Sequence, residues 1–325
     1  MKDYYIFKSG RISRKDNSLV LETNEGNVFI PINDIESLYL FGENDLNTKA
    51  INFLAQQQIV VHFFNYYGWY TGSMYPREFL QSGEVLVKQA AAYLDEKNRI
   101  QIAREFVNAA IHGFINNLKR YPEVEEDIIN KLKDLQKSID SQSTIQSLMG
   151  IEGNARDIYY ETFPIIIKQD IEFEKRVKHP PDNMMNALIS FCNSLVYSLV
   201  IKEIYKTQLN PTISYLHEPS YRRFSLALDV SEIFKPIYAD RMIFDLLNNN
   251  RITQKHFDKD LNYCYLKEEG RKIIVKDFDQ RINTTIMHKK LKRKVSYQKL
   301  VRIELYKLIK HLLGEEQYQS LRIWW

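Results

Sequence analysis

A carboxylate interrupts an otherwise apolar helical stripe near the middle of the chain. At helical spacing, one face of residues 148–163 carries Leu148, Glu152, Ala155 and Tyr159. An unpaired carboxylate is too costly to bury, so Glu152 must be solvated in a cleft, paired with a base such as Arg156, bound to a metal, or protonated. The pattern alone favours a glutamate at a rim or in an ion pair, because structural networks also place acids near cores.

A second group of potential ligands follows later in the chain. His217 lies in an irregular stretch just before a predicted helix that bears Asp229 and Glu232 three residues apart. Like charges at this spacing destabilise a helix by roughly a few tenths of a kcal/mol, so a metal, a lysine or another cation is expected nearby. Two simpler interpretations stay open, namely a structural imidazole at His217 and a solvated acidic face paired with Lys235.

Taken together, these residues form a mixed set of oxygen and nitrogen donors. One glutamate, one histidine and a further acid suit Mg²⁺ or Mn²⁺. Such ions promote phosphoryl transfer as Lewis acids and by activating a hydroxyl nucleophile. The spacing along the sequence does not establish that Glu152, His217 and Glu232 meet in space.

A basic run near the end of the chain is a candidate track for nucleic-acid phosphates. Its members are Lys289, Lys290, Lys292, Arg293 and Lys294, with Arg281 before them and Lys299 and Arg302 after them. A solvated surface is an equally good interpretation of such a run. The formal net charge is only +4, but residues 1–80 hold 7 Lys/Arg against 9 Asp/Glu, which leaves +6 for the remainder.

The periodicity predicts an α+β protein in two parts. In residues 1–80, alternating apolar residues predict a β-rich, β-sandwich-like domain with strands near 4–8, 11–13, 18–22, 27–31, 35–41 and 59–64, a hairpin around 67–74, and one short helix at 47–57. In residues 84–325, apolar spacings of three and four predict a larger helical domain that carries the candidate site. Its helices are expected near 100–118, 123–138, 144–168, 184–205, 225–234, 239–248 and 297–313.

Composition excludes several other classes of protein. The chain is 44% hydrophobic and 26% charged, as in an ordinary globular protein. Its two cysteines, Cys192 and Cys264, have neither zinc-site nor disulfide-framework spacing. The sequence shows no secretory leader, and no apolar run approaches the roughly 18 residues of a membrane span. We therefore expect a cytoplasmic protein.

The segments that carry these residues resemble the CRISPR-associated protein one family, the metal-dependent integrase and endonuclease of spacer acquisition. The resemblance rests on 150-GIEGNARDIYYETF-163, on 176-RVKHPPDNMMNALISF-191, and on His217 followed by 225-SLALDVSEIFKPIYADR-241, in the expected order. The β-rich unit with 68-GWYTGSMYPRE-78, ahead of a helical body, is also similar. The resemblance covers nearly the whole chain.

The resemblance implies specific roles for the candidate residues. Glu152 matches the family's catalytic glutamate, His217 its metal-binding histidine, and Glu232 the third ligand, while Asp229 is similar to an acid one turn earlier. Tyr197 falls where the family places a tyrosine that lines the active site, although a core tyrosine is an equally good interpretation.

The same resemblance implies the reaction and the partners. The expected reaction joins the 3′-hydroxyl ends of short DNA fragments (protospacers) into a CRISPR array by transesterification, and water as nucleophile would instead cut DNA, especially branched DNA. The expected assembly is a homodimer joined through the β-rich domains, with two dimers flanking a dimer of the small ferredoxin-like CRISPR-associated protein two. A stand-alone structure-selective repair nuclease and a non-catalytic DNA-binding scaffold remain as alternatives.

Overall fold

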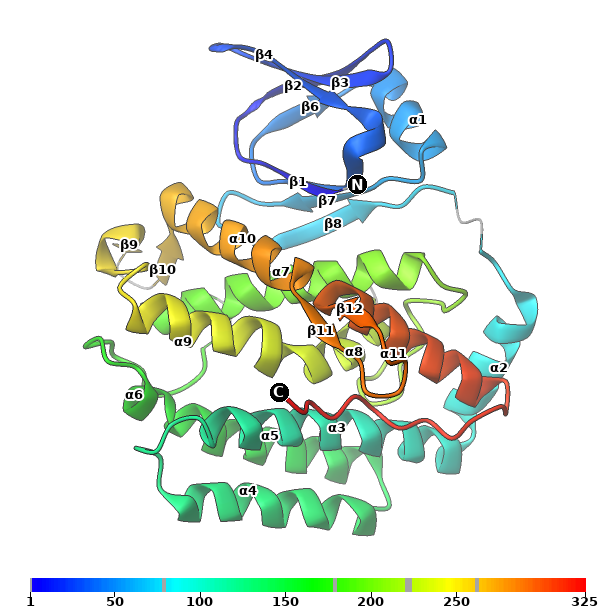
Figure 1. Ribbon diagram of the computed structural model, residues 1–325, viewed down its shortest axis with the longest axis vertical. Helices are drawn as coiled ribbons and strands as arrows, with labels where there is room; N and C mark the ends of the chain where they lie inside the picture. The colour runs from blue at the N-terminus through cyan, green and yellow to red at the C-terminus, as the bar shows by residue number, and fades with distance from the viewer. Residues whose placement is uncertain (1, 78–79, 178–179, 220–223, 261–262) are drawn as a thin grey trace.

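The protein has an α+β architecture, as the sequence predicts. The computed structural model describes residues 2–77, 80–177, 180–219, 224–260 and 263–325 of the 325-residue chain. Figure 1 shows strands and one short helix at one end of the molecule, and a larger body built mainly of helices beneath them.

Two four-stranded sheets form the N-terminal part. One sheet has the order β1 (Lys2–Ile6), β5 (Ile35–Leu40), β7 (Val60–Phe64) and β8 (Tyr70–Met74). Its first three strands are parallel, and β8 pairs with β7 in the antiparallel sense. The other sheet has the order β4 (Gly26–Pro31), β3 (Ser18–Thr23), β2 (Gly10–Lys15) and β6 (Asn44–Leu46), and α1 (Thr48–Gln56) lies beside it.

A separate apolar cluster holds this part together. Its buried members include Ile12, Leu19, Leu38, Leu54 and Val61. The helix α1 begins at Asn47, whose side chain accepts a hydrogen bond from the Ala50 N–H at 2.9 Å. The single strands expected from the sequence lie within about two residues of the observed ones. The separate hairpin expected around 67–74 is wrong, because that stretch holds one strand, β8, which pairs with β7. The strand β6 was not anticipated, because three residues with two polar side chains carry no alternation.

The second part consists mainly of helices. They are α2 (Gly83–Leu94), α3 (Glu96–Leu118), α4 (Glu126–Ser138), α5 (Ile145–Glu161), α6 (Phe163–Ile166), α7 (Met184–Tyr205), α8 (Ser225–Lys235), α9 (Arg241–Asn248), α10 (Glu268–Asn283) and α11 (Tyr297–Leu312). Two small antiparallel hairpins accompany them, β9 (Phe257–Asp260) with β10 (Tyr263–Leu266), and β11 (Thr285–Met287) with β12 (Lys294–Ser296). The sequence pattern predicted neither α10 nor these hairpins.

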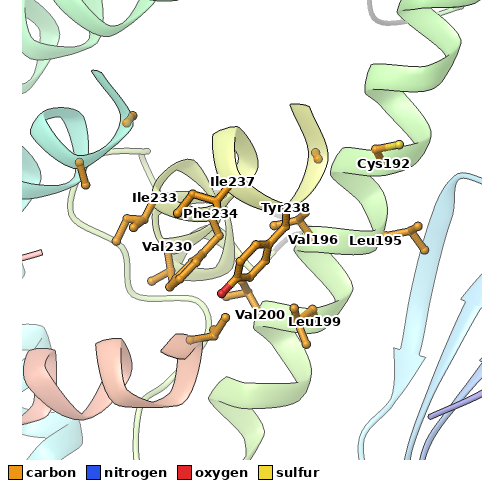
Figure 2. Packing of buried hydrophobic residues seen from close by; sticks show 14 of the residues in the cluster. Cys192, Leu195, Val196, Leu199, Val200, Val230, Ile233, Phe234, Ile237 and Tyr238 are labelled. Carbon is orange, nitrogen blue, oxygen red and sulfur yellow. The ribbon is translucent and has the colours of Figure 1, made fainter. Parts of the chain in front are cut away.

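The helix α7 is the centre of the helical part. Figure 2 shows its side chains Leu195, Val196 and Leu199 among residues that follow one another along α8 and the turn after it, Val230, Ile233, Phe234, Ile237 and Tyr238. By length and composition α7 could cross a membrane, although no apolar run of that length was expected from the sequence. However, 72% of the most apolar 18-residue window of α7 is buried inside the protein. This burial is typical of a core helix.

A π-helical turn, Pro236–Asp240, connects α8 to α9. Proline lacks the N–H that would continue the α-helical ladder, so a change of helix type at Pro236 has a local cause. The helix α3 passes close to this turn at Gly113, where a Cβ would lie 2.9 Å from the Pro236 side chain. One turn further, the Asn117 amide donates to the Pro236 carbonyl at 2.7 Å and to the Tyr159 hydroxyl at 2.9 Å. These contacts tie α3, α5 and α8 together.

Buried charges fasten the β-rich part to α7. The Lys202 ammonium donates to both carboxylate oxygens of Asp3, at 3.0 and 2.7 Å, and the two side chains are 0% and 2% exposed. One turn along α7, Lys206 pairs with Glu36 on β5. Because removing one partner strands the other charge in the interior, the Lys202–Asp3 pair makes the packing of the two parts interdependent.

We predict that Lys202→Met lowers the free energy of unfolding by about 3–5 kcal/mol, because Asp3 stays buried without its cation. Urea denaturation measures this loss. Lys206→Met is the matched control, since its ion pair is 22% exposed on both sides and should contribute about 1 kcal/mol or less. Equal losses of unfolding free energy in the two variants would show that burial of the Lys202–Asp3 pair does not increase its contribution to stability.

Candidate functional site

Two acids from different helices meet at one arginine. Arg156 on α5 donates from Nε to Glu152 Oε1 at 2.8 Å, and its Nη2 also pairs with Glu152 and with Glu232 on α8. The side chains of Glu152 and Glu232 are only 19% and 7% exposed. Glu152 is therefore ion-paired, as one of the sequence alternatives proposed, and the partner is the arginine four residues later.

The local sequence explains why Glu152 reaches this position. The helix α5 begins at Thr144, whose hydroxyl accepts from the Ser147 N–H at 3.1 Å. Along its inner face Leu148, Ala155 and Tyr159 are fully buried. Glu152 and Arg156 lie one turn apart beside this face, a spacing at which side chains of opposite charge reach each other.

The charges of the site are nearly balanced by neighbouring bases. Burial by itself would raise the pKa of Glu232, but Arg156, Lys235 and His217 together hold that pKa well below its usual range. The Lys235 ammonium donates to Glu232 Oε1 at 2.6 Å. Glu232 is therefore ionised at neutral pH and is held from two sides.

His217 is positioned by Asp229, which is fully buried on α8. Asp229 Oδ1 accepts from the His217 N–H at 2.9 Å and lies 2.8 Å from His217 Nδ1. Its Oδ2 accepts from the backbone N–H groups of Tyr215 and Leu216 at 2.7 and 2.9 Å. In the tautomer that donates Nδ1–H to Asp229, Nε2 keeps a free lone pair, which is the usual arrangement of a metal-binding histidine and its orienting carboxylate.

The two acids of α8 thus have different environments, although they lie three residues apart. Glu232 turns toward Arg156 and Lys235, whereas Asp229 satisfies the backbone of the segment that carries His217. The solvated acidic face that stayed open from the sequence is wrong for Asp229, because the helix packs it inside the protein.

Tyr197 lies on α7 and is half-buried. Its hydroxyl accepts from the Phe224 N–H at 3.0 Å, immediately before α8, and its ring meets Tyr70 edge-on at 5.2 Å between centroids. These contacts connect α7, β8 and the start of α8. A direct role of Tyr197 in catalysis stays a prediction.

The basic run forms the turn of the hairpin β11–β12. Lys289, Lys290, Lys292, Arg293 and Lys294 are all exposed. Within the part of the chain that the structure describes, none of the five forms an ion pair. Arg281 on α10 differs, because Asp277 and Asp245 hold its guanidinium, the latter at 2.7 Å. The hairpin turn is thus a patch of uncompensated positive charge, whereas Arg281 is engaged within the protein.

The donor set fits a hard divalent cation, but it is not preassembled. Among the described residues, no three His, Cys, Asp or Glu side chains already lie together as a metal-binding group. The Arg156 guanidinium bridges Glu152 and Glu232, where a divalent ion would balance the same negative charge. Two carboxylates and one imidazole suit Mg²⁺ or Mn²⁺ once the guanidinium leaves the carboxylates.

One acid near the site was not recognised from the sequence. Asp240, in the π-helical turn, is 4% exposed, and burial raises its pKa to about 7 against the opposing effects of Arg156 and Lys235. Asp240 lies within residues 225–241, one of the segments that carry the family resemblance. It comes near Arg156 because it stands in the π-helical turn. The pattern of the sequence carries no signal for that geometry.

The fold and the site together define an α+β protein whose helical part holds two carboxylates at one arginine, and a histidine that a buried aspartate orients. Residues 4–280 match the family described as CRISPR associated protein Cas1, and the chain belongs to this family. A curated relative from Thermodesulfovibrio yellowstonii, named CRISPR-associated endonuclease Cas1 3, is 51% identical over 326 residues and is covered, like this chain, over 100% of its length.

Solved structures agree with this assignment. A Cas1 protein from Thermotoga maritima has a TM-score of 0.91 at 40% identity, with 99% of this chain and 100% of that chain covered. A casposase bound to its integration product has a TM-score of 0.88 at 20% identity, with 99% and 93% covered. At this lower identity the likeness to the casposase shows a common fold.

We predict that Asp229→Asn lowers the free energy of unfolding by about 1–3 kcal/mol, because one amide oxygen cannot replace the acceptors used by His217, Tyr215 and Leu216. The same change should alter the tautomer of His217, which ¹⁵N NMR of the imidazole reports. Asp134→Asn is the control, since Asp134 is exposed and pairs only with Lys137. An unchanged His217 spectrum would show that Asp229 does not orient the ring.

Proposed function

We propose that this protein joins the 3′-hydroxyl ends of short DNA fragments into a CRISPR array by metal-dependent transesterification, in the cytoplasm. The observation that carries the proposal is the meeting of Glu152 and Glu232 at one arginine, Arg156. His217 is near enough to Glu232 to help lower its pKa, and Asp229 orients its ring. Phosphoryl transfer needs little covalent chemistry from the protein, so positioning and charge are the main contributions of such a site.

Glu152, Glu232 and His217 Nε2 are the groups that would hold the ion. When bound, Mg²⁺ or Mn²⁺ supplies Lewis-acid stabilisation of the phosphate and lowers the barrier to attack by a hydroxyl. Asp229 keeps the imidazole in the tautomer that leaves Nε2 free, and Lys235 holds Glu232 in place. Arg156 pairs with both carboxylates before the ion arrives, and with Lys235 it keeps the pKa of Glu232 well below its usual range.

Contacts with DNA are proposed for the basic hairpin turn. Four exposed cations between β11 and β12, together with Lys294 at the start of β12, suit the phosphates of a duplex, and such contacts provide affinity without reading the base sequence. The excess of positive charge outside residues 1–80 agrees with this placement. Arg281 would have to break its ion pairs with Asp277 and Asp245 before it could bind a DNA phosphate.

The names of similar proteins point to both DNA cleavage and integration. The relative with 51% identity is named an endonuclease, and the casposase of similar fold was solved with an integration product. Joining and cutting differ in the nucleophile, a DNA 3′-hydroxyl in one case and water in the other. The same three residues can serve both reactions.

The assembly is proposed from the family resemblance. We expect a homodimer joined through the β-rich parts, and two such dimers on either side of a dimer of the small CRISPR-associated protein two. Residues 1–80 carry a small negative charge, which makes them a poor clamp for DNA but leaves them suitable for a protein interface.

We predict that Glu152→Ala, His217→Ala and Glu232→Ala each abolish strand joining, while the folded protein still binds DNA. The reason is that each change removes one donor for the ion. The assay mixes the protein, its small partner, a short duplex with free 3′-hydroxyls and a repeat-bearing plasmid, with Mg²⁺, Mn²⁺ or a chelator. Exposed Glu126→Ala on α4 is the matched control.

The products separate the alternatives. Joined DNA that requires both the metal and Glu152 supports the proposal. Cleavage without joining indicates a nuclease. DNA binding without chemistry in any metal indicates a scaffold. Metal-dependent joining by a well-folded alanine variant would remove that residue from the site.

We predict that Lys290→Glu with Lys292→Glu weakens binding of a short duplex and reduces its salt dependence, by about one unit of slope for each lysine that binds a phosphate in the wild type. Fluorescence anisotropy across a salt series measures both quantities. Lys131→Glu with Lys133→Glu on exposed α4 is the control for charge alone. Identical salt slopes for the two double variants would assign the hairpin turn to an ordinary solvated surface.

A further inference from the structure

A polar cavity of about 420 Å³ lies where the end of α3, the π-helical turn, α9, α10, α11 and the last residues of the chain meet. Its lining includes Arg120, Tyr121, Arg241, Arg281 and Trp325. None of Glu152, His217 or Glu232 lines it. Its volume falls within the roughly 300–1,000 Å³ of small-ligand sites.

Positive charge exceeds the negative charge around this cavity. Arg281 is held by Asp245 and Asp277, but among the described residues no carboxylate side chain pairs with Arg120 or Arg241. Arg241 donates from Nε to the Asn117 amide oxygen at 2.6 Å, and both of its Nη atoms lie 3.4 Å from a carboxylate oxygen of Trp325, residue 325 of the 325-residue chain. Burial and the neighbouring Arg120 lower the pKa of Arg241. The Trp325 carboxylate offsets part of the positive charge at Arg241, whereas Arg120 has no acidic partner among the described residues, so a further anion at this wall is favoured.

An unused hydrogen-bond donor points to the same kind of ligand. Trp325 Nε1 is buried and has no acceptor within the described part of the chain. A buried N–H without an acceptor is unfavourable, so such a group calls for a ligand oxygen or a water molecule. The Trp325 ring packs on Tyr297 at 5.5 Å, and Tyr121 meets Phe244 edge-on at 5.7 Å, so aromatic walls accompany the arginines.

We propose that this cavity binds a phosphate group, with the guanidinium groups of Arg120 and Arg241 as its main partners. Arginine presents several donors in a planar fork that matches phosphate oxygens. The phosphate belongs either to a small free molecule or to the backbone of a DNA strand, and both sources share this chemistry. Only the second source rests on the proposed function.

The cavity is connected to the site through one side chain. Asn117 accepts from Arg241 and donates to the Tyr159 hydroxyl on α5, one helix turn from Arg156. A phosphate at Arg241 would therefore be linked, through Asn117, to the helix that carries Glu152.

The experiment compares the full-length wild type with Arg120→Gln, Arg241→Lys and Lys119→Gln. Arg120 is exposed, so its replacement spares the core, and Arg241→Lys keeps the charge but removes the planar fork. Lys119 is the adjacent exposed cation and does not line the cavity, so Lys119→Gln controls for the loss of one charge. Inorganic phosphate is titrated by calorimetry, and a short DNA duplex by anisotropy across a salt series.

Two results support the proposal and distinguish the sources. Binding of inorganic phosphate that weakens about tenfold in Arg120→Gln and Arg241→Lys, but not in Lys119→Gln, identifies a small-phosphate site. If free phosphate does not bind, a contact of the cavity with the DNA backbone is identified by weaker DNA binding in both Arg120→Gln and Arg241→Lys, with a reduced salt slope in Arg120→Gln, and by no change in Lys119→Gln. No phosphate binding, with equal DNA affinities for Arg120→Gln and Lys119→Gln, would overturn it. Loss of strand joining in Glu152→Ala tests the proposed function separately.

Discussion

The site depends on keeping two carboxylates close together and largely out of water. Glu152 and Glu232 would repel each other and lose hydration if no cation stood between them. Arg156 and Lys235 supply that positive charge, so Glu152 and Glu232 can lie at one centre without a bound ion. A centre balanced in this way has carboxylate donors of the kind that a divalent cation requires, so the proposed metal binding would be an exchange of one cation for another.

The packing of the surrounding helices positions the residues of this site. The helix α8 is held by the apolar face of α7 and by the close approach of Gly113 to Pro236 (Figure 2). Because α8 is fixed, its buried Asp229 can anchor the segment of His217 through four hydrogen-bond contacts. The histidine therefore needs no helix or strand of its own, and its orientation follows from the packing of its neighbour.

Much of this arrangement could be predicted from the sequence, for reasons that differ between elements. The helix α7 was predicted with its observed bounds, because a long apolar run follows the Asn183 cap. Glu152 stood out because it interrupts an apolar stripe. The different environments of Asp229 and Glu232 could not be predicted, because their partners come from other parts of the chain. Asp229 contacts the segment of His217, and Glu232 contacts Arg156 on α5. The helix α10 was missed because its many charged residues obscure the periodicity, and the basic run could not be placed on a hairpin turn because its strands have three residues each.

The most direct measurement is a crystal structure of the protein soaked with Mn²⁺, with the ion located by its anomalous scattering. If the exchange of cations is correct, one ion lies within bonding distance of Glu152, Glu232 and His217 Nε2, and the Arg156 guanidinium has moved away from both carboxylates. An ion bound elsewhere, with Arg156 still bridging Glu152 and Glu232, would contradict the account.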